Sequence, residues 1–98
     1  MILSKEQIQQ TIKEYFIGKP VKKVWLFGSY ARGEAVENSD VDFLIDIEKD
    51  AQLGVAYYHW RTELEVMLNK KLDIVTAGWE SKFIKPFIDR DKNIIYER

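Results

Sequence analysis

Three aspartates and one Gly-Ser pair are the residues of this sequence whose types and spacing point to chemistry. Gly28-Ser29 is followed, ten residues later, by Asp40-Val41-Asp42, and a further acid, Asp73, lies between two apolar residues. Alternate residues of a strand project to the same face, so Asp40 and Asp42 would face the same way. Two carboxylates held together repel each other unless a cation relieves them. We therefore expect a divalent metal site, with Mg²⁺ as the natural ion because it prefers oxygen ligands and shares its shell with phosphates.

Asp73 is expected to complete a triad with Asp40 and Asp42. A lone charge inside an apolar strand is costly unless it has a partner or a metal. Two metal ions about 4 Å apart can stabilise the attacking and leaving oxygens of an in-line displacement. A third carboxylate is useful there, either as a ligand or as the base for the attacking hydroxyl. The three aspartates are thus predicted to be both the metal ligands and the catalytic residues.

The Gly-Ser pair has the properties of a phosphate-binding turn. Gly28 lacks a side chain, so backbone N–H groups can approach a phosphate closely, and Ser29 adds a hydroxyl at the start of a helical turn. Arg32, one turn further on, either contacts the triphosphate or pairs with Glu34 or Glu37. No Gly-Lys-Ser/Thr follows, so this is not a Walker A loop. The Asp-Val-Asp run also lacks the remaining ligands of an EF-hand.

Hydrophobic periodicity predicts the elements that position these residues. A capping box formed by Ser4 and Gln7 opens the first helix. Pro86 lies inside the last predicted helix and would kink it. Helices are expected over residues 5–16, 53–69 and 80–90, and strands over 21–27, 40–48, 72–76 and 93–96.

The strand order follows if the site residues must meet. Gly28 leaves the end of the first strand and Asp40 begins the second, so these strands converge only if they are antiparallel. The helix over 53–69 is long enough to make the second and third strands parallel neighbours, which places Asp73 beside Asp42. The predicted fold class is α/β (α+β): a small mixed sheet with helices packed on one face.

Length and composition limit the function classes. The 98 residues suit one domain, 1–98, and leave no room for a separate acceptor-binding domain. The net charge of −1 makes nucleic acid an unfavoured main partner. There are no cysteines for a disulfide or a thiol zinc site. Neither a signal peptide nor a membrane-spanning apolar run is evident, so we expect a cytoplasmic protein.

Aromatic residues add one hint of a protein partner. Trp25, Trp60 and Trp79 are expected to anchor the core, and His59, the only histidine, to be structural or exposed. The run 57–60 holds three aromatic rings and this histidine on successive positions, which cannot all point inward. Some aromatic surface is therefore expected to remain exposed.

With these residues in view, the sequence resembles the polymerase-β-type nucleotidyltransferase superfamily, and specifically its minimal nucleotidyltransferase (MNT) branch. The resemblance covers nearly the whole chain and is carried by four segments: Phe27 to Gly33, Asn38 to Ile45, Lys71 to Thr76, and Ile94 to Glu97.

The resemblance implies transfer of a nucleoside monophosphate, AMP from ATP, to a hydroxyl with release of pyrophosphate. It implies that Asp40, Asp42 and Asp73 hold Mg²⁺, as two ions, and that Gly28 and Ser29 hold the phosphates of the nucleoside triphosphate. Minimal members are similar to antitoxins whose partner is a helical HEPN-type ribonuclease toxin, and some add AMP to a tyrosine of that toxin. Oligomerisation is left open.

Two other functions remain as alternatives. The chain could be a non-catalytic binding antitoxin that neutralises its partner by occlusion, as small size and exposed aromatic residues would allow. It could also transfer a nucleotide to a small acceptor such as an aminoglycoside, with a second subunit supplying the missing wall of the site.

Overall fold

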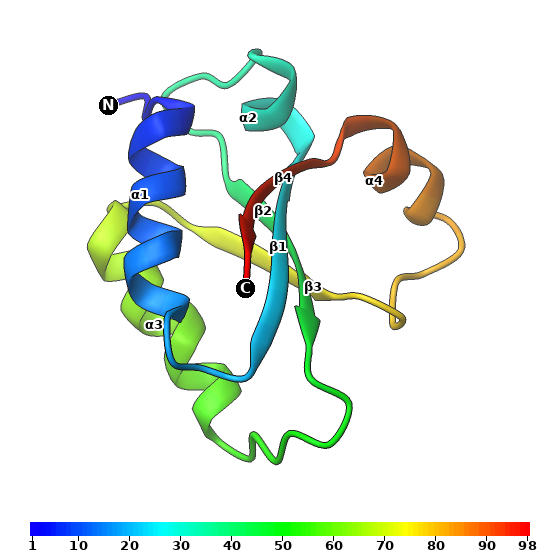
Figure 1. The fold of residues 1–98 in the computed structure, drawn as a ribbon. Helices are drawn as coiled ribbons and strands as arrows, with labels where there is room; N and C mark the ends of the chain where they lie inside the picture. The colour runs from blue at the N-terminus through cyan, green and yellow to red at the C-terminus, as the bar shows by residue number, and fades with distance from the viewer.

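The computed structural model describes residues 1–98 and shows a four-stranded mixed sheet with two long helices and two short ones (Figure 1). The strand order across the sheet is β3-β2-β1-β4. The elements in chain order are α1 (Lys5–Phe16), β1 (Val21–Phe27), α2 (Gly28–Arg32), β2 (Val41–Ile47), α3 (Ala56–Leu68), β3 (Leu72–Thr76), α4 (Lys85–Asp91) and β4 (Asn93–Glu97).

The pairing of the strands confirms the predicted topology. Strand β1 is antiparallel to both β2 and β4, whereas β2 and β3 are parallel. A parallel pair needs a long crossover connection, and α3 provides it. The sheet therefore brings the start of β2 next to the start of β3, as the site requires.

The first helix begins where the capping pattern predicts. The Gln7 N–H donates to the Ser4 hydroxyl at 3.1 Å, and the Ser4 N–H donates to the Gln7 side chain at 2.8 Å. These two bonds satisfy orphan donors of the first turn. Ile8, Ile12 and Phe16 then fall on one face and are fully or almost fully buried. This face packs the helix against the sheet.

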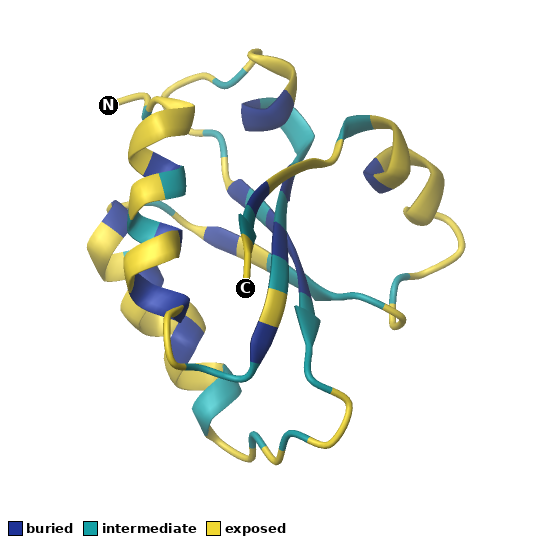
Figure 2. Cartoon of the chain, viewed as in Figure 1, coloured by how far each residue is buried: buried dark blue, intermediate teal, exposed yellow.

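Helices α1 and α3 cover one face of the sheet and enclose the main core of 17 buried residues (Figures 1 and 2). Trp60 of α3 packs edge-on against Phe16, with ring centroids 5.5 Å apart, as expected of a core anchor. Trp25 is only half-buried. The expectation for Trp79 is wrong: it lies after β3, outside the layer between helices and sheet, and is 84% exposed. Tyr58 and His59 are exposed.

The last helix differs from the prediction. It begins at Lys85 instead of residue 80, and Pro86 lies in its first turn and does not kink it. Proline suits that position because its fixed φ is helical and no N–H is needed there. Helix α4 lies across the sheet from α1 and α3 (Figure 1). Ile88 of α4 and Leu44 of β2 are buried outside the main core, so this second face of the sheet also buries apolar side chains.

None of the helices combines the length and the apolar character needed to cross a membrane.

Candidate active site

The turn between β1 and α2 approaches Asp42 so closely that only glycine fits. Gly28 has φ +75°, and a Cβ added there would lie 3.0 Å from Asp42 Cγ and closer still to Asp42 Oδ2. The approach follows from the antiparallel register, which pairs Phe27 with Asp42. The Gly-Ser turn and Asp42 are thus neighbours in space, as predicted.

The parallel register places two of the aspartates on adjacent strands. Asp42 of β2 pairs with Asp73 of β3, while Asp40 lies just before β2 and is exposed. Asp42 is half-buried, but Asp73 is exposed. The expectation that Asp73 is a charge buried in an apolar strand is therefore wrong, because β3 is an edge strand whose Asp73 side chain faces an open cavity.

The electrostatics single out Asp42. Its pKa is raised from 3.8 to about 6, first by burial and then by the negative charges of Asp73 and Asp40. Arg32 opposes the rise. The negative charges of Asp73 and Asp40 thus act on Asp42, and a cation placed among the three carboxylates would be favoured.

The three carboxylates do not form a ready-made coordination sphere. No three His, Asp or Glu side chains of the structure are arranged to hold a metal ion, and Asp40 and Asp73 line different hollows. The donors are nevertheless all carboxylate oxygens, the chemistry that suits Mg²⁺. The residues fit such an ion in donor type and charge, and side-chain rotation would be needed to bring their oxygens onto it.

A cavity of about 420 Å³ lies between α2, the start of β3 and α4. Gly28, Arg32 and Asp73 all line it, so three of the predicted site residues share one hollow. Phe27 of β1 and Ile84, which precedes α4, form part of its other walls. The rest comes from α4 itself: Phe87, Ile88, Arg90 and Asp91. The sequence pattern does not predict that α4 contributes to this cavity, because the contribution depends on how α4 packs against the sheet.

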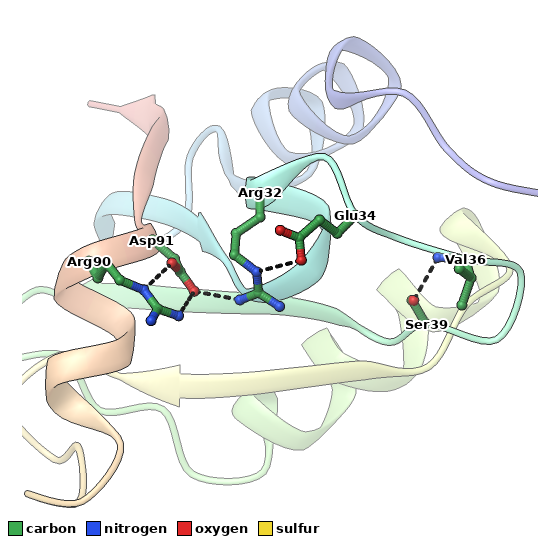
Figure 3. Close-up of polar contacts among 6 residues, drawn as sticks. All are labelled: Arg32, Glu34, Val36, Ser39, Arg90 and Asp91. Carbon is green, nitrogen blue, oxygen red and sulfur yellow. Dashed lines mark hydrogen bonds and ion pairs between the residues drawn. The ribbon is translucent and has the colours of Figure 1, made fainter.

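Arg32 is held from two sides (Figure 3). Its Nε donates to Glu34 at 3.3 Å, which is one of the expected pairings, and its Nη1 donates to Asp91 at 2.6 Å. Glu37 instead pairs with the N-terminal amine. Arg32 and Asp91 are separated by 59 residues in sequence, and no local pattern marks such a pair. Ser39, in the same figure, accepts a hydrogen bond from the Val36 N–H at 2.8 Å and closes a turn.

The fold and the paired acids beside a glycine turn define a nucleotidyltransferase. The family model described as polymerase beta nucleotidyltransferase matches residues 6–98. The chain belongs to this family and is an enzyme of the nucleotidyltransferase class.

Known proteins agree with this assignment. A candidate protein adenylyltransferase of Methanocaldococcus jannaschii is 36% identical over 73 residues, which cover 72% of this chain and 73% of the relative. A solved structure of a candidate minimal nucleotidyltransferase superposes with a TM-score of 0.74 at 26% identity, over 93% of this chain and 95% of that one. The structure of an AMPylated Shewanella oneidensis HEPN toxin with its MNT antitoxin shares the fold, with a TM-score of 0.62 at 18% identity over 92% and 73%.

Proposed function

We propose that this chain transfers the adenylyl group of ATP to a tyrosine hydroxyl of a HEPN-type toxin, and so acts as the antitoxin of that partner. The observation that carries the proposal is the pairing of Asp42 with Asp73 on adjacent strands, directly beside the glycine turn at Gly28. The name of the archaeal relative supports the adenylyl group, and the Shewanella complex supports a HEPN toxin as the acceptor.

In this reaction the tyrosine oxygen attacks the α-phosphorus of ATP. The bond from that phosphorus to the bridging oxygen breaks, pyrophosphate leaves, and the hydroxyl proton passes to a base. Gly28 and Ser29 would hold the phosphates through backbone N–H groups and a hydroxyl. Arg32 would add a guanidinium, whose fork of donors matches phosphate geometry.

Asp40, Asp42 and Asp73 would hold Mg²⁺. When bound, the metal would neutralise charge on the phosphates and on the leaving group. The pKa of Asp42 is raised first by burial and then by the negative charges of Asp73 and Asp40. This supports the assignment, because a cation would relieve the repulsion among the three acids. We propose one domain, residues 1–98, working in the cytoplasm, where ATP is supplied.

The surface around the cavity supports a protein acceptor. Four large apolar side chains on residues 79–87 are exposed, and two of them also line the cavity. They are Trp79, Phe83, Ile84 and Phe87. Exposed apolar groups gathered in one segment are typical of a protein interaction site. A partner docked on this segment would bring its tyrosine toward Asp73.

The test is a transfer assay with the purified chain, Mg²⁺, ATP labelled at the α-phosphate, and the HEPN-type protein encoded beside it. Label is expected on the partner with the wild-type chain. It should be lost with Asp42→Asn, which keeps the side-chain volume and removes the charge. Absence of transfer by the wild type, or undiminished transfer by Asp42→Asn, would overturn the proposal.

The exposed apolar segment also favours a second candidate function, neutralisation by occlusion without chemistry. The double variant Asp40→Ala and Asp42→Ala separates the two functions, because it leaves residues 79–87 intact. If this variant still protects cells from the toxin as well as the wild type does, occlusion is sufficient. If protection is lost while the complex still forms, transfer is required.

A further inference from the structure

The carboxylate that ends α4 holds two arginines together at the wall of the cavity. Asp91 accepts from Arg32 Nη1 at 2.6 Å, from Arg90 Nε at 2.9 Å and from Arg90 Nη2 at 3.4 Å (Figure 3). Its side chain is only 5% exposed. A carboxylate with two oxygens can serve two guanidinium groups in this way.

This cluster joins parts of the chain that are distant in sequence. Arg32 ends α2, which follows β1, whereas Arg90 and Asp91 end α4. The guanidinium of Arg90 also lies 5.3 Å from the centroid of the Phe87 ring. Arg90 therefore contacts both a carboxylate and an aromatic ring.

Both arginines keep donors that these bonds do not use. A guanidinium carries five N–H groups. Arg32 donates from Nε to Glu34 and from Nη1 to Asp91, and its Nη2 makes no hydrogen bond within the chain. Arg90 donates from Nε and Nη2 to Asp91, and its Nη1 makes no hydrogen bond within the chain. Both residues line the cavity that contains Gly28 and Asp73.

Two arginines with unused donors at one cavity suit a ligand that carries several anionic oxygens, such as a polyphosphate. Arg32 and Arg90 both bind Asp91, whose negative charge offsets the repulsion between the two guanidinium groups. Arginine side chains that are anchored in advance lose less conformational freedom when they bind phosphate.

Resting on the proposed function, we propose that Asp91 is a positioning residue that presents Arg32 and Arg90 to the polyphosphate of the nucleotide. Arg90 is then a second phosphate-binding arginine, and α4 forms one wall of the triphosphate site.

The test compares Asp91→Asn with Asp89→Asn. Asp89 lies on the same helix and also pairs with two cations, Lys85 at 3.4 Å and Lys92 at 3.2 Å, but it does not line the cavity. Affinity for Mg-ATP, inorganic triphosphate and AMP is measured by calorimetry. We expect Asp91→Asn to lower the affinity for ATP and for triphosphate roughly tenfold. That is the effect of losing one charge-assisted hydrogen bond between an arginine and a phosphate. AMP should change less than twofold, and Asp89→Asn should change none of the three.

Two further variants distinguish positioning from a structural role. Arg90→Gln should reproduce the selective loss of triphosphate affinity, and Asp91→Glu should restore part of it. In the transfer assay Asp91→Asn should raise KM for ATP more than it lowers kcat. Equal weakening of ATP and AMP binding would overturn the inference, and so would unaltered triphosphate affinity in Asp91→Asn or in Arg90→Gln. A wild-type chain that binds no triphosphate would also overturn it.

Failure of this inference is distinguishable from failure of the proposed function. Selective triphosphate binding that depends on Asp91, without any transfer to the partner, would refute the proposed transfer and keep the binding site. Transfer to the partner with normal ATP affinity in Asp91→Asn would keep the transfer and refute the role of Asp91.

Discussion

Replacing Gly28 with alanine tests the close approach between the glycine turn and Asp42. Two costs are expected. The first is backbone strain, because φ is +75° and a left-handed residue other than glycine costs about 1–2 kcal/mol. The second is displacement of Asp42, whose Cγ would lie 3.0 Å from the new Cβ. The end of a short side chain can rotate away, so we expect this second cost to appear mainly as lost function.

Gly33 provides a matched control. It also has φ +75°, and a Cβ there would meet nothing within 4 Å. Gly33→Ala should therefore lose about the same 1–2 kcal/mol of unfolding free energy as Gly28→Ala. Only Gly28→Ala should lose catalysis, by about 100-fold, since misplacing a reacting group by about 1 Å can cost that much.

Chemical denaturation measures the stability of both variants, and the labelled-ATP assay measures transfer at a temperature where both are folded. If Gly28→Ala transfers label as fast as Gly33→Ala, a Cβ at position 28 does not disturb the function of Asp42, contrary to our expectation. Equal loss of activity in the two variants would also contradict this expectation, because the loss would then follow from strain in the turn and not from Asp42.

The remaining predictions concern pH and the exposed apolar segment. Because the pKa of Asp42 is raised from 3.8 to about 6, its unfavourable contribution is absent below about pH 4 and develops as pH rises through 6. A two-unit shift of a fully buried group corresponds to about 3 kcal/mol of unfolding free energy. Asp42 is half-exposed, and because solvent screens its charge we expect a loss of about 1 kcal/mol. Asp42→Asn should remove that loss in denaturation curves of the metal-free chain, and an unchanged pH profile would contradict the cause assigned to the shift. The double variant Trp79→Ser and Phe83→Ser should weaken association with the partner at least tenfold in calorimetry, whereas Tyr58→Ser, an equally exposed ring on α3, should leave it unchanged. Equal binding by all three chains would place the interface elsewhere.

Local patterns were sufficient for most of the sheet. Hydrophobic periodicity predicts β2 over residues 40–48, one residue longer at each end than the observed strand, and predicts β3 over 72–76 with its observed bounds. The requirement that Gly28, Asp42 and Asp73 meet then predicted which strands are parallel. These inferences worked because a two-residue period and a crossover length are properties of the chain itself.

The errors concern tertiary context. Trp79 was expected inside because tryptophan is usually well buried, yet it follows an edge strand, where no layer covers it. Residues 80–84 have helical spacing but do not join α4, which begins beside Pro86. The contact of Asp91 with Arg32 spans 59 residues and depends on where α4 docks. A helical period cannot reveal which face of a sheet a short helix will cover.

Counting the products of the reaction tests whether this chain transfers AMP to the tyrosine of its partner. Wild-type chain, Mg²⁺, ATP and the HEPN-type partner are incubated, pyrophosphate is quantified, and adenylylated tyrosines on the partner are located by mass spectrometry. We expect one pyrophosphate for each AMP found on tyrosine, and neither product with Asp42→Asn. Neutralisation of the partner with no AMP on it, or AMP transfer that continues in Asp42→Asn, would contradict this expectation.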